Sequence, residues 1–230
     1  MTTYWCDNSE VKTHYLDAFS VLFPAWEQAW AAVVHAHLND VEDLALRKRM
    51  LDFIAQETAH GKAHAAHNRR IGQTSAEAAE HEKIQLVLKR PKMKIWLAAM
   101  VSIEHIASCL SRDYLARYGN RTGREYALFR WHSIEELEHK SLAIDLWDAL
   151  GYPRSDLRAH AAKNLRYVLR FVYEYMSDKL QGAGGARRVA GGLYCGWHGL
   201  TVIAKSFYAV TRSGFHPTNT DDTKLLARFA

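Results

Sequence analysis

Two short Glu-x-x-His motifs carry the side chains of this sequence that are best suited to bind metal. The first is Glu57-x-x-His60 and the second is Glu136-x-x-His139. Positions i and i+3 of a helix lie about 60° apart on one face, so the carboxylate and the imidazole of each motif can reach one ion. The competing interpretation is chance, because long helices sometimes place a Glu and a His three residues apart.

A lone glutamate in an apolar stretch precedes each motif, which makes chance a weaker explanation. Glu27 lies 30 residues before the first motif, and Glu104 lies 32 residues before the second. An ionised carboxylate among apolar side chains needs a partner, and divalent cations would supply one. Four helices that contribute Glu, Glu-x-x-His, Glu and Glu-x-x-His make a carboxylate-bridged dimetal site inside a helical bundle. Carboxylate with imidazole suits two iron ions, with manganese or zinc as alternatives.

Two further histidines share the faces of these motifs. His132 precedes the second motif by four residues, and His64 follows the first by four. Each either ligates a metal, hydrogen-bonds to a ligand or packs in the core; we place His132 among the ligands and expect His64 beside one. Glu135 approaches the same face, and His105 is expected in the core or next to a ligand. The predicted ligands are therefore Glu27, Glu57, His60, Glu104, His132, Glu136 and His139.

Composition predicts a single all-α domain. The 230 residues are 48% hydrophobic and 24% charged, with only four prolines and 13 glycines. No apolar run reaches the ~18 residues of a membrane span, and the N-terminus lacks the pattern of a secretory signal, so we expect a cytoplasmic protein. The three scattered cysteines argue against disulfides and thiolate zinc sites. The net charge of +5 is dispersed, which argues against nucleic-acid binding.

Prolines, glycines and capping residues divide the chain into seven expected helices. We expect Asn39 or Asp40 to cap the second helix and Ser155 to cap the sixth. The fold class is a ferritin-like four-helix bundle, in which two antiparallel helix pairs, 24–70 and 91–150, are joined by a long crossover. Residues 13–150 form this core, and 151–230 add C-terminal helices to the same domain. The expected helices span 13–37 (or a start at 24), 41–70, 76–89, 91–118, 124–150, 156–180 and 193–211, with an irregular polar tail from Ser213.

Several blocks of sequence resemble a bacterial family known as predicted metal-dependent hydrolases. The resemblance spans most of the chain and implies metal dependence, although nothing in these residues argues for hydrolysis over oxidation. Trp26 departs from the family, which has a glycine before this glutamate. The blocks are Phe23-Pro24-Ala25-Trp26-Glu27, Gln56-Glu57-x-x-His60-x-x-x-His64, Glu104-His105, Trp131-His132-x-x-Glu135-Glu136-x-Glu138-His139-Lys140 and Gly214-Phe215-His216-Pro217.

The ligand pattern alone is similar to that of a second group, the ferritin-like di-iron N-oxygenases that oxidise arylamines. These enzymes have seven ligands, and the third histidine corresponds to His132 in His132-x-x-x-Glu136-x-x-His139. The similarity implies a site that is richer in nitrogen and less anionic than the common one with four Glu and two His.

The leading functional hypothesis is a non-haem di-iron oxygenase or oxidase. It would use O2 and an electron donor on a small-molecule substrate, such as an amine or a lipid-like compound. The first alternative is a dimetal hydrolase that uses metal-bound hydroxide. The second is a non-enzymatic helical protein that binds a partner or handles iron. A homodimer and a peripheral membrane contact through the apolar segment 193–211 are both compatible with the sequence.

Overall fold

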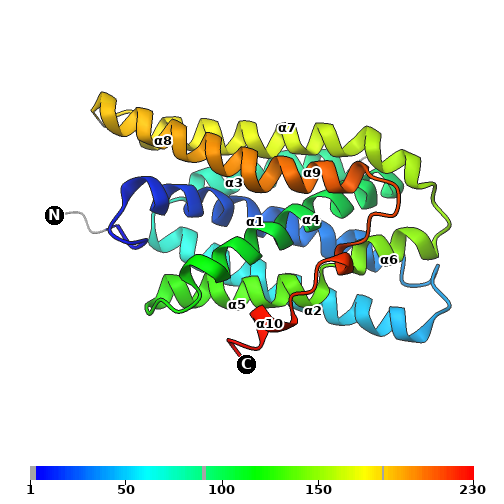
Figure 1. Cartoon of the computed structure of the whole chain (residues 1–230). Helices are drawn as coiled ribbons and strands as arrows, with labels where there is room; N and C mark the ends of the chain where they lie inside the picture. The colour runs from blue at the N-terminus through cyan, green and yellow to red at the C-terminus, as the bar shows by residue number, and fades with distance from the viewer. Residues whose placement is uncertain (1–3, 90–91, 183) are drawn as a thin grey trace.

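Four long helices form the bundle that was predicted. The computed structural model describes residues 4–89, 92–182 and 184–230, and within these ranges it contains helices and no strand. The bundle helices are α1 (Glu10–Ala36), α2 (Leu44–Arg70), α4 (Met93–Tyr118) and α5 (Arg124–His139). α1 packs along α2 and α4 along α5 (Figure 1). The all-α helical bundle is therefore confirmed.

The remaining helices connect and cover the two pairs. α3 (Thr74–Leu88) is the crossover and packs on α1, while α6 (Leu142–Ala149) follows α5. α7 (Arg154–Lys179) packs against both α1 and α4. Beside α7 run α8 (Gly185–His198), the π-helical turn η1 (Gly199–Ile203) and α9 (Ala204–Thr211) (Figure 1). Two short helices, η2 (Pro217–Asn219) and α10 (Thr223–Leu226), lie in the C-terminal tail.

α1 is the central helix, which explains its content of large apolar side chains. It contacts α2, α3, α4, α7 and α8, so most of its circumference is buried. It begins at Glu10 because the side chain of Ser9 accepts a hydrogen bond from the backbone N–H of Lys12. It then passes through Pro24 without ending, so both expected starting points, Thr13 and Pro24, were wrong.

Two predicted helix caps were also wrong. α2 begins at Leu44, where Asp43 accepts from the N–H groups of Ala45 and Leu46, rather than at Asn39 or Asp40. α7 begins at Arg154 with Pro153 as its N-cap, so Ser155 lies inside the helix. Pro91, the expected start of the third helix, lies outside the described residues.

The expected helix 124–150 is two helices, α5 and α6, separated by a turn at Lys140 and Ser141 whose backbone dihedrals remain in the right-handed helical region. The ammonium of Lys140 donates to Asp222 and to the carbonyl of Thr220, and the hydroxyl of Ser141 donates to Asp145. The break therefore falls directly after the second Glu-x-x-His motif.

The C-terminal segment is more ordered than expected. The helix expected over 193–211 starts at Gly185 and contains the π-helical turn. The tail after Ser213 crosses the bundle and is held by the buried carboxylate of Asp222, which pairs with Arg112 and Lys140 (Figure 1).

One helix in the described part of the chain, α4, is long and apolar enough to cross a membrane by length and composition. Within its most apolar window, 61% of the residues are buried in the bundle. A core helix of a bundle passes the same test, and α4 occupies that position here.

Candidate metal centre

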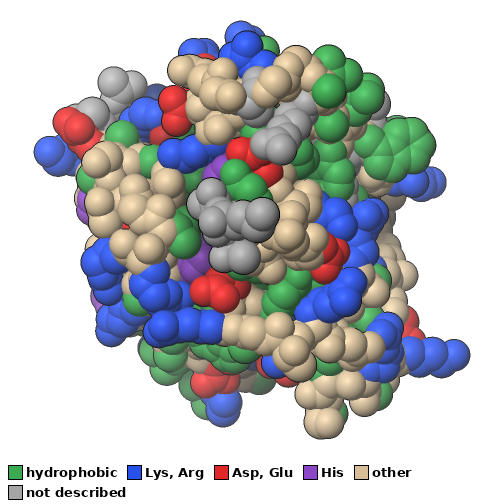
Figure 2. Space-filling view, turned by 90° about the vertical axis from the view of Figure 1, so that its left-hand side faces the viewer, with side chains coloured by type: hydrophobic (Ala, Val, Ile, Leu, Met, Phe, Trp, Pro, Cys, Tyr) green, Lys and Arg blue, Asp and Glu red, His purple; other side chains and the backbone are tan. Residues whose placement is uncertain are grey.

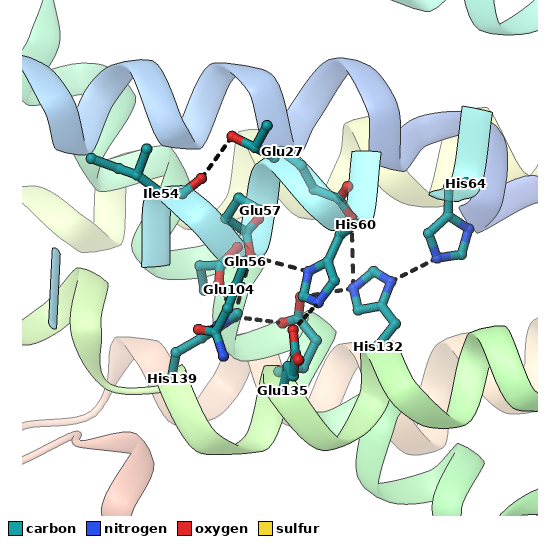
Figure 3. Close-up of polar contacts among 12 residues, drawn as sticks. Glu27, Ile54, Gln56, Glu57, His60, His64, Glu104, His132, Glu135 and His139 are labelled. Carbon is teal, nitrogen blue, oxygen red and sulfur yellow. Dashed lines mark hydrogen bonds and ion pairs between the residues drawn. The ribbon is translucent and has the colours of Figure 1, made fainter. Parts of the chain in front are cut away.

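The structure brings all seven predicted ligands together in the core of the bundle. α1 supplies Glu27, α2 the first motif, α4 Glu104, and α5 His132 with the second motif (Figure 3). Each of these side chains is at most 8% exposed. Six of them form two groups of three, and within each group the candidate ligand atoms lie within 4.8 Å of one another. The groups are Glu27, His60 and His132, and Glu57, Glu136 and His139, with Glu104 beside the second.

The two motif glutamates belong to the second group but also contact histidines of the first. Oε1 of Glu57 is 3.4 Å from Nδ1 of His60 and 3.4 Å from Nε2 of His139. Oε1 of Glu136 is 2.8 Å from Nε2 of His132, and its Oε2 is 3.6 Å from Nε2 of His139. Each carboxylate can therefore face both groups at once, which is the position of a bridging ligand.

The two lone glutamates lie at the outer sides of the cluster. Oε1 of Glu27 is 3.6 Å from Nε2 of His132, and Oε2 of Glu104 is 3.6 Å from Nε2 of His139. Each therefore faces one group, the position of a terminal ligand.

Buried polar atoms without hydrogen-bond partners make these residues fit a pair of cations. Leaving a buried polar group unsatisfied costs about 1–3 kcal/mol, and more if the group is charged. Such groups concentrate here and converge on one volume, and two divalent cations would satisfy them together. The atoms are both carboxylate oxygens of Glu27 and Glu57, Oε2 of Glu104 and Glu136, Nδ1 of His60 and Nε2 of His139.

The pKa values of the cluster without metal also indicate that its carboxylates require positive charge nearby. Burial, and then repulsion between neighbouring carboxylates, raises the pKa of Glu27, Glu57 and Glu104 well above its usual value. Burial opposes the charge of His139, but Glu136 and the other acids outweigh it and raise the His139 pKa to about 10. Burial likewise opposes ionisation of Glu136, yet its histidine neighbours lower its pKa. Protons occupy the cluster when cations do not.

Two of the three histidines hold their outer nitrogen in a hydrogen bond to an acceptor. Nε2 of His60 is 2.8 Å from Oε2 of Glu135, whose other oxygen accepts from the indole of Trp131 at 2.8 Å. Nδ1 of His139 is 3.3 Å from Oε1 of Gln56. A metal-binding histidine usually donates its second N–H in this way, which fixes the tautomer and the direction of the ring.

The third histidine, His132, is oriented by a longer chain of hydrogen bonds. The amide nitrogen of Asn68 donates to the Ser20 carbonyl and to Glu77, so Oδ1 of Asn68 is the acceptor for the Ser20 hydroxyl at 2.8 Å. The Ser20 oxygen must then accept from Nδ1 of His64, also at 2.8 Å. Nε2 of His64 is left to accept the Nδ1 proton of His132 at 2.7 Å.

This order of donors leaves the inner nitrogen of His132 with a free lone pair. Burial lowers the pKa of His132 to about 4 and that of His64 well below its usual value, so both rings are neutral. In this tautomer Nε2 of His132 has no proton to donate to Oε1 of Glu136, 2.8 Å away, and a cation held by both atoms would take the place of that hydrogen bond.

The outer residues His64, Glu135 and His105 fall into two kinds. His64 and Glu135 both contact a predicted ligand through its outer nitrogen. His105 points elsewhere: its ring packs on Phe215 with 4.7 Å between centroids, and its Nε2 is 3.8 Å from the sulfur of Cys109.

Sequence reasoning assigned no role to Gln56, Ser20, Asn68 or Trp131. A signal existed for two of them, because Asn68 follows His64 by four residues and Ser20 precedes Glu27 by seven, on the same helical faces.

Gly61 allows α1 and α2 to approach each other beside Glu27. A Cβ atom at this position would lie 3.4 Å from Oε2 of Glu27 and 3.6 Å from the Cα of Pro24. These are ordinary contact distances, so the helices pack closely here, and only a side chain larger than alanine would push on the carboxylate.

Apolar pockets adjoin the cluster. Two neighbouring pockets share Phe19, Phe23, Ala107 and Leu110, and both reach Glu136. One continues outward to Tyr194 of α8, and the other follows Trp26 and Trp30. No Lys or Arg is among the described residues that line either pocket. The lining is mostly apolar, and the volumes of about 50 and 40 Å³ hold only a few water-sized groups in this conformation.

Of three comparisons with known proteins, the one with family models finds a match. A search of curated proteins and a search of solved structures find no match. A family model with the description "predicted metal-dependent hydrolase" matches residues 1–221, a range that includes the whole cluster. The chain therefore belongs to the predicted metal-dependent hydrolase family.

Proposed function

We propose that this chain is a dinuclear metal-dependent enzyme. The observation that carries the proposal is the convergence of two buried Glu and His groups whose inner atoms lack hydrogen-bond partners. In this assignment Glu57 and Glu136, which face histidines of both groups, would hold both ions, and Glu27, His60 and His132 would hold one ion while Glu104 and His139 would hold the other. The hydrogen-bonded outer residues keep the imidazoles in the ligating tautomer.

Hydrolysis is the reaction that the family description supports. Two divalent ions supply Lewis acidity and an activated water when they are bound. The chain itself would contribute the positions of the ligands and a pocket that admits the substrate and little bulk water. The absence of Lys and Arg from the described lining argues for an uncharged ester or amide rather than a phosphoester.

Activation of O2 is a second candidate, because the ligands and the pocket favour it. Three imidazoles and four carboxylates form a set of hard and borderline ligands that suits iron. The apolar lining would exclude water from the site. Exclusion of water matters more for this reaction than polar contacts with the substrate. The substrate would be a small amine or a lipid-like molecule, and turnover would require an electron donor.

One experiment tests the proposal and separates the two reactions. The chain would be purified from cells grown with iron, manganese and zinc in turn, and metal per chain would be measured. About two ions per chain would support the dinuclear site, whereas no bound metal in any preparation would refute it. O2 uptake by the anaerobically reduced iron form would favour oxidation. Ester or amide cleavage by the zinc form, without O2 uptake by the iron form, would favour hydrolysis.

A further inference from the structure

The outer face of α8, η1 and α9 exposes a line of apolar and aromatic side chains. Val189, Leu193 and Trp197 are 62%, 69% and 68% exposed, and they follow one another at intervals of four residues. Past the π-helical turn, Tyr208 of α9 is 64% exposed as well. Isolated exposed apolar residues are common on proteins, but three at four-residue intervals on one helix, followed by a fourth on the next helix, are unusual. We call these four residues the α8–α9 stripe.

The neighbouring face of α7 widens this surface. Tyr173 is 70% exposed, and Leu169 lies one turn before it. Both residues line a pocket of about 560 Å³ between α7 and α8. The pocket continues inward to Val172 and Met176, so its walls are mostly apolar. Stripe and pocket together form a broad surface that could accept an extended apolar partner.

The charges on α8 and α9 are of one sign, whereas the adjoining face of α7 carries two exposed acids, Glu174 and Asp178, the second of which lies 3.6 Å from Lys179. Residues 179–220 include Lys and Arg but no Asp or Glu. Arg188, Lys205 and Arg212 are exposed along the same helices, and the guanidinium of Arg212 lies 5.8 Å from the ring centroid of Tyr208. The exposed Glu174 on α7 already pairs with Arg170. Figure 2 shows hydrophobic side chains gathered at the upper right of one end of the molecule, with Lys and Arg below them.

We propose that this face docks on the surface of an anionic lipid bilayer. A helix with an apolar stripe, aromatic residues and flanking cations lies in the interface plane, where the stripe enters the acyl boundary and the cations meet acidic headgroups. A second copy of the chain fits less well, because a symmetric contact would bring the cations of α8 and α9 together, while the acids Glu174 and Asp178 of α7 already lie beside Arg170 and Lys179. α8 also contributes Tyr194 to the pocket beside the metal cluster, so docking would bring that pocket close to lipid.

Flotation of the full-length chain with lipid vesicles tests this proposal. Vesicles of phosphatidylcholine alone would be compared with vesicles of equal parts phosphatidylcholine and phosphatidylglycerol. We expect the chain to float with the anionic vesicles only, and added salt to weaken the binding. Loss of two large exposed apolar side chains in Leu193→Asn/Trp197→Ser should lower partitioning by about tenfold or more.

Matched variants on another face control for general changes in hydrophobicity and charge. Leu44 and Leu51 of α2 are 76% and 56% exposed, so Leu44→Asn/Leu51→Ser removes comparable side chains and should leave partitioning unchanged. Arg188→Glu should weaken binding, whereas reversal of the exposed Lys48 should not. Circular dichroism and metal content of each variant verify that it is folded.

Three outcomes would overturn the proposal. The first is equal flotation with neutral vesicles, because charge would then play no part. The second is unchanged flotation of the stripe variant. The third is a wild-type dimer in sedimentation velocity that becomes monomeric in the stripe variant, since the face would then be an interface between two copies.

Discussion

Removal of the metal should make the stability of this chain depend steeply on pH. Without cations, burial and mutual repulsion raise the pKa of Glu27, Glu57 and Glu104 well above the usual value, and the acids around His139 raise its pKa to about 10. In the unfolded chain the same groups titrate near ~4.3 for Glu and ~6.5 for His. At pH 7–8 the folded metal-free chain therefore holds protons that unfolding releases.

The sign and the size of the effect follow from this difference. When the folded state binds more protons than the unfolded state, the free energy of unfolding falls as the pH rises. One retained proton corresponds to about 1.4 kcal/mol per pH unit. Four such groups set an upper bound of about 5.5 kcal/mol per pH unit between pH 7 and 8. The buried histidines with a lowered pKa, His60, His64 and His132, act mainly below pH 7 and have the opposite sign; their residual protonation in the unfolded chain offsets only about 0.4 kcal/mol between pH 7 and 8.

Urea unfolding of the chelator-treated chain and of the metal-loaded chain at pH 7, 7.5 and 8 measures the effect. We expect the metal-free chain to lose at least about 1.4 kcal/mol over this interval, and the metal-loaded chain to lose much less, because its carboxylates are already ionised. Glu104→Gln should flatten the metal-free profile, since an amide has no proton to release, while Glu138→Gln on the exposed face should not. A metal-free stability that is flat or rises from pH 7 to 8 would refute the reasoning.

Three further predictions concern single residues. Glu136→Ala should remove half or all of the bound metal in elemental analysis, whereas Glu138→Ala, two residues along the same helix but exposed, should retain it. His64→Phe should keep the fold and weaken metal binding by about 10–100-fold in a competition titration, because His132 loses the acceptor that orients it; an unchanged affinity would contradict that role. Asp222→Ala should lower the unfolding free energy by about 2–3 kcal/mol, because it leaves Arg112 and Lys140 without their carboxylate. Asp221→Ala, at an exposed site whose carboxylate accepts from Thr223, should cost about 1 kcal/mol or less.

The predicted ligands could be found in the sequence because helices convert spacing into direction. Glu57 and His60 must share a face if the segment is helical, and the apolar neighbours of Glu27 and Glu104 indicate that these acids are buried. The helical bundle could be predicted from the helical periodicity and from the prolines and glycines between the segments. Which oxygen of a carboxylate faces which imidazole depends on the packing of four helices and could not be predicted.

Contacts between distant segments account for most of the errors. The helix expected to run to Leu150 breaks after His139, where Lys140 binds the carboxylate of Asp222 and Arg49 donates to the hydroxyl of Ser141. Neither partner is close in sequence, so no local pattern marks the break. The ligand helix is thereby held in place at the residue that follows its last ligand, and the C-terminal tail contributes to the position of the cluster without touching it.

The glycines of α8 led to a wrong predicted start of this helix, again because contacts with a distant segment determine where it begins. Their low helix propensity places the start of the helix too late, at Leu193 instead of Gly185. In the fold, a Cβ at Gly191 would lie 2.5 Å from a methyl carbon of Leu180, so the glycine allows α8 to pack against the end of α7. Packing therefore offsets the weak propensity. It also fixes which face of α8 is left outward, and that face carries Val189, Leu193 and Trp197. A helix built from poor helix formers persists here because it is docked, and its exposed apolar residues then need a partner outside the chain.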